Sequence, residues 1–322
     1  MNLYASINDN EVIYMPYDLS DKLKIAVTTR ALFQLESENR IYEERGRIEY
    51  EEYQISKEND VLQKGAAFTL INALLSINKI HQTKDRVEVI LVSRNSANTS
   101  LRVYNSIETY NLPITRGFFT GGANLTPYLA AINIDLFLTA NPSDAQQAID
   151  AGIPAAVLLT ENIPEYSEEN SNQIRIAFDG DAVLFSEESE LIYKQGGLDK
   201  FAENEAIHAN DPMNEGPFAK FLRTIADLQN ALGEEQEVIR TALITARNAP
   251  SHERVIKTLR AWNVRIDEIF FLGGISKTPI LQTFGAQIFF DDQKTYTEPA
   301  SLVVPSGTVP YSSESKLNKY KK

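Results

Sequence analysis

The 322-residue chain resembles itself when it is shifted by 151 positions. Residues 24–33 then align with residues 175–184. After one added residue the register still holds at residues 118–122, FFTGG, which align with residues 270–274, FFLGG. Similarity that keeps one register over more than a hundred residues indicates an internal duplication. We therefore expect two copies of one fold.

Each copy alternates short apolar runs with amphipathic stretches. Runs such as Val89–Val92 and Ile269–Leu272 are continuous, as in strands that are covered on both faces. Residues 253–262 place apolar side chains at helical spacing. The predicted fold class is α/β, with two Rossmann-like parallel sheets, each interrupted by a mainly helical insert. The expected boundaries are residues 20–165 for the first copy with an insert at about 34–84, residues 170–311 for the second copy with an insert at about 186–236, and a polar, frayed tail at residues 312–322.

Charge and composition exclude several classes of function. The chain has 31 basic and 44 acidic residues, and its net charge of −13 disfavours a nucleic acid polymer as partner, although small phosphorylated metabolites stay open. The absence of cysteine excludes disulfides, thiolate nucleophiles and zinc-thiolate sites. Residues 1–18 lack the pattern of a signal peptide, and no apolar run has the length of a membrane helix. We expect a cytoplasmic protein with no membrane partner; a homo-oligomer is compatible with these features.

Two pairs of carboxylates follow predicted strands. Asp179 and Asp181 come directly after the apolar run Ile174–Phe178, and Asp291 and Asp292 end another apolar run. Reactive residues of parallel sheets lie at the carboxyl ends of strands, so the four side chains should approach one another. A single Asp-x-Asp pair could equally belong to a solvated loop. Four carboxylates at two strand ends require a hard cation, for which Mg²⁺ is the natural choice.

A hydroxyl group and a lysine complete the pattern. Thr245 ends the apolar run 242–244 and can donate to an anion, while Lys277 follows the Gly273-Gly274 turn and can neutralise one. Taken alone, each would be a strand-end hydroxyl or a surface lysine. In chain order with the carboxylates, they predict phosphoryl transfer with a carboxylate nucleophile.

At this point the sequence resembles the haloacid dehalogenase-like phosphohydrolases, whose four motifs follow in the same order. Longer segments are similar to the cytosolic 5′-nucleotidase type I family, namely Ala26–Phe33, Ile176–Glu190, Leu243–Ala249 and Ile288–Gln293. The resemblance extends from about residue 20 to residue 311. It implies haloacid dehalogenase-type copies with helical caps, and Mg²⁺-dependent hydrolysis of AMP-type nucleoside 5′-monophosphates through an aspartyl-phosphate.

The resemblance also implies a role for each residue of the pattern. Asp179 is expected to be the nucleophile, and Asp181 the general acid that later becomes the base. Asp291, together with Asp292, is expected to hold the metal alongside Asp179 and the backbone carbonyl of Asp181. The residues expected to bind the phosphoryl oxygens are Thr245 and Lys277.

The second insert, as a cap over the catalytic strand ends, is expected to select the substrate. Candidates for contact with the base are Phe201, His208 and Phe218, although an aromatic side chain in a helical insert is more often part of the core. Arg247 and Asn248 are candidates for contact with phosphate or ribose. A structural role is equally open for this pair, because the first copy has Arg94-Asn95 at the similar place. No histidine is expected to take part in catalysis.

The first copy lacks the catalytic set. Opposite Asp179, Asp181, Lys277, Asp291 and Asp292 it has Thr28, Arg30, Leu125, Thr139 and Ala140, and it keeps only Ser93 opposite Thr245. We expect it to be inactive and to serve as a packing partner. The less favoured alternative is a vestigial anion site formed by Arg30, Ser93 and the Gly121-Gly122 turn.

Two other functions remain open for the whole chain. A phosphatase for sugar phosphates or other small phosphomonoesters would keep the catalytic residues and differ in its cap. A non-catalytic nucleotide sensor would bind without hydrolysis, and the intact Asp179 and Asp181 argue against it.

Overall fold

The structure is a computed structural model, and it describes residues 5–8, 11–14, 17–161, 163–164, 173–233 and 237–320. The expected boundaries at residues 165, 170 and 236, and the last two residues of the tail, lie outside these ranges. The first half means residues 17–161 and the second half residues 173–320.

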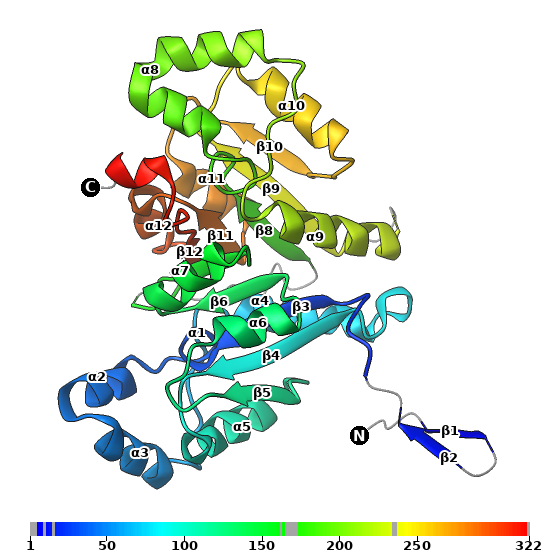
Figure 1. The fold of residues 1–322 in the computed structure, drawn as a ribbon, viewed down its shortest axis with the longest axis vertical. Helices are drawn as coiled ribbons and strands as arrows, with labels where there is room; N and C mark the ends of the chain where they lie inside the picture. The colour runs from blue at the N-terminus through cyan, green and yellow to red at the C-terminus, as the bar shows by residue number, and fades with distance from the viewer. Residues whose placement is uncertain are drawn as a thin grey trace.

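A ten-stranded sheet runs through both halves in the order β10-β9-β8-β11-β12-β7-β6-β3-β4-β5 (Figure 1). All neighbouring strands are parallel except β7 and β12, which are antiparallel. The strands are β3 (Leu23–Thr28), β4 (Val87–Ser93), β5 (Arg116–Phe119), β6 (Leu136–Thr139), β7 (Ala155–Leu158), β8 (Ile174–Phe178), β9 (Ile239–Thr245), β10 (Glu268–Phe271), β11 (Ile288–Asp291) and β12 (Ser306–Thr308). The prediction of an α/β fold is confirmed.

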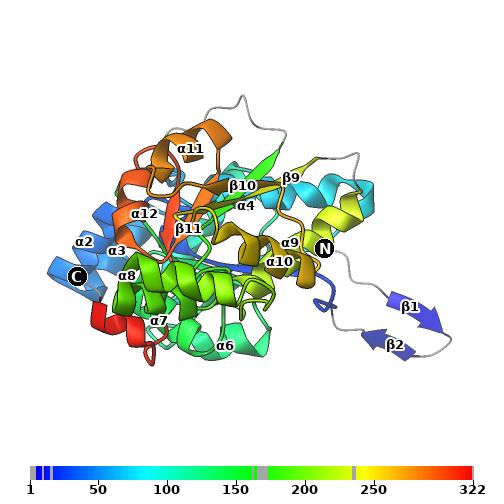
Figure 2. The same cartoon turned by 90° about the horizontal axis from the view of Figure 1, so that it is seen from above.

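Helices connect and cover these strands. They are α1 (Thr29–Leu32), α2 (Glu36–Arg45), α3 (Arg47–Ser56), α4 (Phe68–Ser76), α5 (Ser100–Thr109), α6 (Thr126–Ala131), α7 (Pro142–Asp150), α8 (Glu188–Ile207), α9 (Ala219–Leu232), α10 (His252–Ala261), α11 (Lys277–Phe284) and α12 (Lys294–Ala300), with short 3-10 turns η1 (Ile77–Lys79), η2 (His81–Thr83), η3 (Ala97–Thr99) and η5 (Lys316–Tyr320). The hairpin of β1 (Ala5–Asn8) and β2 (Glu11–Tyr14) lies apart from the rest, as Figure 2 shows. No helix in the described ranges is long and apolar enough to cross a bilayer.

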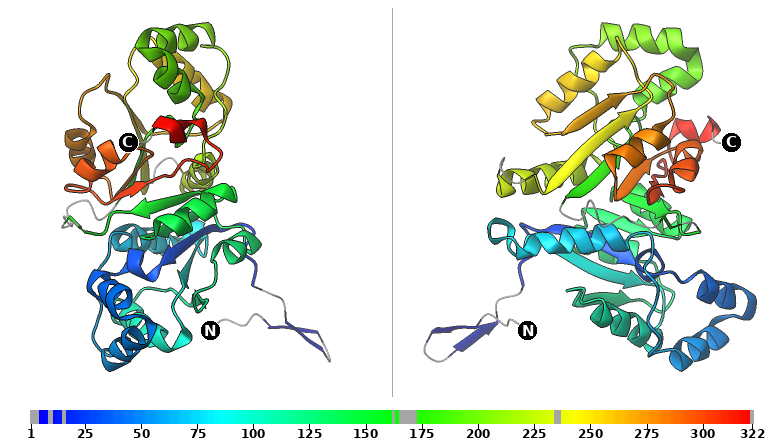
Figure 3. Two further views of the ribbon diagram at one scale, coloured as in Figure 1. Left: turned by 60° about the vertical axis from the view of Figure 1, so that its left-hand side comes forward. Right: turned by 180° about the vertical axis from the view of Figure 1, so that it is seen from behind.

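The two halves have the same strand order when read outward from the β7–β12 junction. The first half gives β7-β6-β3-β4-β5 and the second β12-β11-β8-β9-β10. Figure 3 shows the blue-to-green first half and the green-to-red second half on either side of the junction. The order agrees with the repeat in the sequence, whereas an origin by duplication and the haloacid dehalogenase relationship stay predictions.

Glycines at matching positions support matching turns. Gly46 separates α2 from α3 at φ 87°, and Gly197 bends α8 at φ 74°, a conformation that favours glycine. A Cβ on Gly65 would lie 2.7 Å from backbone atoms of residues 31–33, and one on Gly216 would lie 2.3–2.8 Å from those of residues 183–185. The chain therefore makes the same close approach after the first strand of each half.

Within the expected inserts, only some helices project beyond the sheet. Figure 1 shows α2 and α3 at one end of the molecule and α8 at the other. By contrast, α4 contacts β4 and β8, and α9 places Phe221 against Phe178 and Phe290 in the core. The parts that can act as caps are therefore α2–α3 and α8.

The tail is ordered through residue 320, which corrects the expectation of a frayed end. Leu317 in η5 is only 1% exposed and packs with Ala182 and Tyr311. The Ser313 N–H donates to Asp150, and Ser315 Oγ bonds Glu187. The tail is therefore attached to the rest of the structure by Leu317 and by the hydrogen bonds of a few serines, while its lysines in the described ranges stay exposed.

Candidate active site

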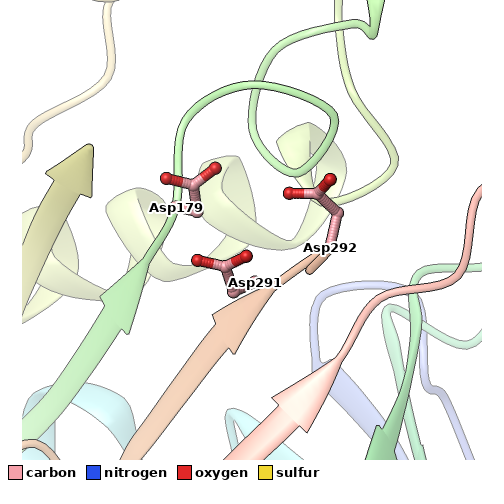
Figure 4. A group of neighbouring side chains, drawn as sticks. All are labelled: Asp179, Asp291 and Asp292. Atoms are coloured by element: carbon pink, nitrogen blue, oxygen red, sulfur yellow. The ribbon is translucent and has the colours of Figure 1, made fainter. Parts of the chain in front are cut away.

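Three carboxylates meet where β8 and β11 end. Asp179 follows β8, Asp291 is the last residue of β11 and Asp292 comes next. The two strands are paired, and the Asp179 N–H donates to the Phe290 carbonyl at 2.8 Å. One carboxylate oxygen from each of the three residues lies within 4.8 Å of those from the other two, and Figure 4 shows the groups facing a common space.

Lys277, the first residue of α11, reaches into this cluster. Its Nζ lies 2.5 Å from Asp179 Oδ1 and 2.6 Å from Asp291 Oδ2. The lysine is 3% exposed and Asp291 is fully buried. Burial alone would lower the pKa of the lysine, but the two carboxylates outweigh it and raise that pKa above its ordinary value. Lys277 is therefore a charged residue of the site and not a surface lysine.

The cluster carries more negative charge than Lys277 can balance. Desolvation raises the pKa of Asp179 to about 7; Lys277 opposes this shift and Asp291 adds to it. Desolvation and the charges of Asp291 and Asp179 also raise the pKa of Asp292 well above its ordinary range. Tyr311 donates to Asp292 Oδ2, while Asp292 Oδ1 is buried without a hydrogen-bond partner among the described residues. This excess of oxygen ligands fits a hard divalent cation.

Thr245 is the last residue of β9, the strand paired with β8 on the side away from β11. The threonine is 2% exposed, and its Oγ1 accepts from the Arg247 N–H at 3.2 Å. Its hydroxyl hydrogen is left to donate to another oxygen. Thr245 thus lies at the same edge of the sheet as the carboxylate cluster.

The Asp181 side chain lies outside the carboxylate cluster. Its two oxygens accept from Arg247 Nε at 2.8 Å and Nη2 at 2.7 Å. Because this bidentate pair occupies both oxygens, the carboxylate is oriented by Arg247. The side chain of Asp181 is therefore not placed to bind a metal at the cluster, and of this residue only the backbone carbonyl could do so.

Arg247 links Asp181, in the loop after β8, to the second insert. Its guanidinium group also pairs with Glu205 on α8 and lies 5.0 Å from the Phe201 ring centroid. Glu205 has no exposed side-chain surface and binds Arg254 on α10 at 3.0 Å. These contacts occupy Arg247 inside the protein, so the structure favours the structural role over the substrate contact.

Sequence reasoning missed Glu205 and Arg254. A signal was present in the repeat, because Arg254 aligns with Arg102. The two arginines make equivalent hydrogen bonds: Arg102 Nε donates to the backbone carbonyl of Asp60, and Arg254 Nε donates to that of Asp211, both at 3.0 Å. The repeat does not reveal Glu205, because the acid that pairs with Arg102 in the first half is Glu38, which is not at the position aligned with Glu205.

The other substrate candidates lie in different environments. Phe201 is 8% exposed and meets Tyr193 edge to face. His208, at the end of α8, is half-exposed and bonds Asp211 at 2.9 Å. Asn248 is exposed. Phe218 is fully buried against Phe221 and Phe290, so its ring belongs to the core.

The match between Arg94-Asn95 and Arg247-Asn248 is wrong by one position. The Asn95 N–H donates to Ser93 Oγ at 3.1 Å, as the Arg247 N–H donates to Thr245. The counterpart of Arg247 in the first half is therefore Asn95.

A model of the 5′-nucleotidase family matches residues 15–316. The chain belongs to the 5′-nucleotidase family. Human cytosolic 5′-nucleotidase 1B is 38% identical over 288 residues, which cover 86% of this chain and 47% of the human protein, so this chain spans about half the length of that relative. A solved structure described as a Pnkp1/Rnl/Hen1 complex is similar over 95% of this chain and 99% of its own, with 16% identity and a TM-score of 0.32, which is too low to support any inference.

Proposed function

We propose that the chain hydrolyses AMP-type nucleoside 5′-monophosphates to nucleoside and inorganic phosphate, and that it requires Mg²⁺. The observation that carries this proposal is the buried cluster of Asp179, Asp291 and Asp292 with Lys277, in a member of the 5′-nucleotidase family. The name of the human relative supports the same activity and a cytosolic location.

In the first proposed step, a carboxylate oxygen of Asp179 attacks phosphorus and the bond from phosphorus to the ribose 5′-oxygen breaks. Asp181 would carry a proton on an oxygen released from its pair with Arg247 and would give it to the departing oxygen, so the nucleoside leaves neutral and an aspartyl-phosphate remains. In the second step, Asp181 takes a proton from water, whose oxygen attacks phosphorus. Phosphate departs and the Asp179 carboxylate is restored, with one water consumed for each phosphate released.

Fixed donors would bind the phosphoryl group during both steps. Lys277 would neutralise one phosphoryl oxygen, and Thr245 would donate its hydroxyl to another. Arg247 would act as a positioning residue, because it orients the Asp181 carboxylate through two hydrogen bonds. Its link to Glu205 would connect that orientation to α8.

Asp179, Asp291 and Asp292 would hold the metal, together with the backbone carbonyl of Asp181. When bound, Mg²⁺ would supply the positive charge that lets a phosphate dianion approach these carboxylates. The unpartnered Asp292 Oδ1 and the raised pKa values of Asp179 and Asp292 support this assignment.

We also propose that the halves are haloacid dehalogenase-type copies derived by duplication, and that α8 covers the catalytic strand ends as a cap. The shared strand order supports the first point. Phe201, His208 and Asn248 remain candidates for contact with the base or ribose. Phe218 and Arg247 do not, because both are committed to internal contacts.

The test is phosphate release from AMP, IMP, GMP, CMP and UMP beside sugar phosphates such as glucose 6-phosphate. We expect release from nucleotides that disappears in chelator and returns with Mg²⁺. Faster release from a sugar phosphate would favour the alternative phosphatase. Nucleotide binding without release would favour a sensor, and full activity in excess chelator would refute the metal site.

A further inference from the structure

The first half contains a cavity at the strand ends that correspond to the candidate active site. It encloses about 440 Å³ and is bordered by the last residues of β3, β4 and β6, which are Thr28, Ser93 and Thr139. Pockets of about 300–1,000 Å³ are typical for small-molecule ligands. We call this cavity the first-half pocket.

The chemistry of this pocket is that of an anion site without a metal. Thr28 and Thr139 take the places of Asp179 and Asp291, so hydroxyl groups replace the carboxylates. Within the described residues, the cluster of carboxylates suited to a cation lies in the second half alone. The charged residues that line the pocket are Arg30, Arg47, Arg94, Glu51 and Asp144, and the three arginines form ion pairs with Glu36, Glu51 and Asp144 respectively.

Among the described residues, three buried atoms of the lining that can donate have no hydrogen-bond partner, namely Thr28 Oγ1, Arg94 Nε and Ser96 Oγ. Thr28 is 8% exposed, and its Oγ1 has no hydrogen-bond partner among the described residues. The same holds for Arg94 Nε, although another nitrogen of this guanidinium group forms an ion pair with Asp144. Leaving such groups unsatisfied is unfavourable, so a ligand oxygen that accepts from both would stabilise the site.

The wall formed by the first insert is aromatic. Tyr42 and Tyr50 line the pocket with ring centroids 5.7 Å apart and planes at 86°. Tyr50 is 7% exposed, and its hydroxyl oxygen accepts from Gln54 at 3.1 Å and Asn95 at 2.9 Å, which fixes its ring. Tyr42 is 50% exposed and offers a surface for a planar ring.

We propose that the first-half pocket binds a nucleoside phosphate without a metal and without hydrolysing it. The phosphoryl group lies near Thr28, Ser93 and Arg94, and the base lies against Tyr42. No bond to phosphorus is broken there, because a threonine hydroxyl stands where the reaction needs a carboxylate nucleophile.

The experiment is isothermal titration of the whole chain with AMP in excess chelator. Under these conditions the carboxylates of the second half repel the phosphate, so heat reports on the first-half pocket. We expect Thr28→Val to raise the Kd about tenfold, the effect of one lost hydrogen bond to a charged group. Tyr42→Ala should also raise the Kd, and inorganic phosphate should bind more weakly than AMP.

Tyr193→Ala is the matched control, because Tyr193 aligns with Tyr42 and is similarly exposed at 43%. It should leave the Kd for AMP in chelator unchanged. Thr28→Val and Tyr42→Ala should keep Mg²⁺-dependent phosphate release within about twofold, which also shows that both variants fold.

Several results would overturn the proposal: no AMP binding at millimolar concentration, a Kd unaffected by Thr28→Val and Tyr42→Ala, or a Kd changed by Tyr193→Ala instead. Equal affinity for AMP and inorganic phosphate would overturn the contact with the base. A chain that binds AMP in this way but never releases phosphate would refute the proposed hydrolysis and leave this inference intact.

Discussion

Lys277 lies between Asp179 and Asp291 and offsets part of their mutual repulsion. The pKa of Asp179 nevertheless rises to about 7, because burial and the neighbouring acid disfavour its charged form. The side chain is therefore held at a cost in stability, in a position where it can react. Perturbed carboxyl groups of this kind are concentrated at functional sites.

Replacing Asp179 with asparagine should abolish phosphate release from AMP. An amide cannot form the aspartyl-phosphate, and a nucleophile contributes several kcal/mol to catalysis, so we expect less than about a hundredth of the original rate. The unfolding temperature of the metal-free chain should stay the same or rise, because a buried charge is removed.

The matched control is Asp199→Asn on the exposed side of α8, which should change neither quantity. A folded Asp179→Asn variant that keeps more than about a hundredth of the rate would contradict the nucleophile assignment.

At the level of elements, the sequence predicts the parallel strands but not their junction. Continuous apolar runs mark strands such as β4, and the repeat predicts the same strand order twice. The junction strands β7 and β12 are short, and β12 reads only Ser-Gly-Thr, so neither propensity nor periodicity marks their pairing. A Cβ on Gly307 would lie 3.0 Å from side-chain atoms of Ala156 and Leu158. The contact between β7 and β12 therefore depends on the close packing of Gly307 against side chains of β7.

In the candidate site, too, the sequence predicts residues at strand ends but not contacts between distant elements. Asp179, Asp291, Asp292 and Lys277 follow strands or a glycine turn, so strand-end reasoning brings them together. Glu205 lies on an insert helix, where pairing depends on helix orientation, which local sequence does not encode.

Glu205→Gln should destabilise the second half by about 3 kcal/mol, since it leaves Arg247 and Arg254 buried with too little compensation. Burial would raise the pKa of Glu205, but Arg247 and Ser189 hold that pKa below its ordinary value. The folded state therefore binds the proton less readily than the unfolded state. The stabilisation is full above the ordinary pKa of a glutamate and is lost as pH falls through the folded-state pKa.

The measurement is the free energy of unfolding by denaturant, for the Glu205→Gln variant and the unsubstituted chain, at neutral and acidic pH. The first half supplies a matched rescue, because it has Glu38 opposite Ser189 and Gln54 opposite Glu205. The double variant Ser189→Glu/Glu205→Gln should be more stable than Glu205→Gln alone. Equal stability of Glu205→Gln and the unsubstituted chain would show that the pairing is dispensable.

On the scale of the whole molecule, the antiparallel junction reverses the direction of the strands. Since β7 and β12 run in opposite directions, the carboxyl ends of the two sets of parallel strands lie at opposite edges of the sheet. The first-half pocket and the carboxylate cluster are therefore separate sites.

Ser93→Ala should leave turnover of saturating AMP within a few-fold of the original value, because Ser93 lies at the other edge of the sheet. Thr245→Ala, at the aligned position, should lower turnover strongly through lost contact with the phosphoryl group. The measurement is the rate of phosphate release from AMP by the two variants, compared with that of the unsubstituted chain. Equal, large losses would mean that the first half supplies part of the active site.

Deleting residues 1–150 should give aggregated protein instead of a smaller enzyme. One hydrophobic cluster extends through both halves, α4 contacts β8, and Lys220 pairs with Asp135 across the halves at 2.9 Å. Removing the first half exposes this apolar surface. Size-exclusion chromatography and phosphate release test this expectation, and a monomeric, active fragment would contradict it.

The position of β12 has a consequence for the order in which the protein is assembled. Each junction strand is the last strand of its half in the chain, so the sheet is completed at its centre and not at an edge. During synthesis, β7 emerges well before residues 306–308 leave the ribosome, and one side of it stays an open strand edge in the meantime. The open side of β7 must therefore wait until β12 has been synthesised before it is paired, and in that interval a second nascent chain can compete for it.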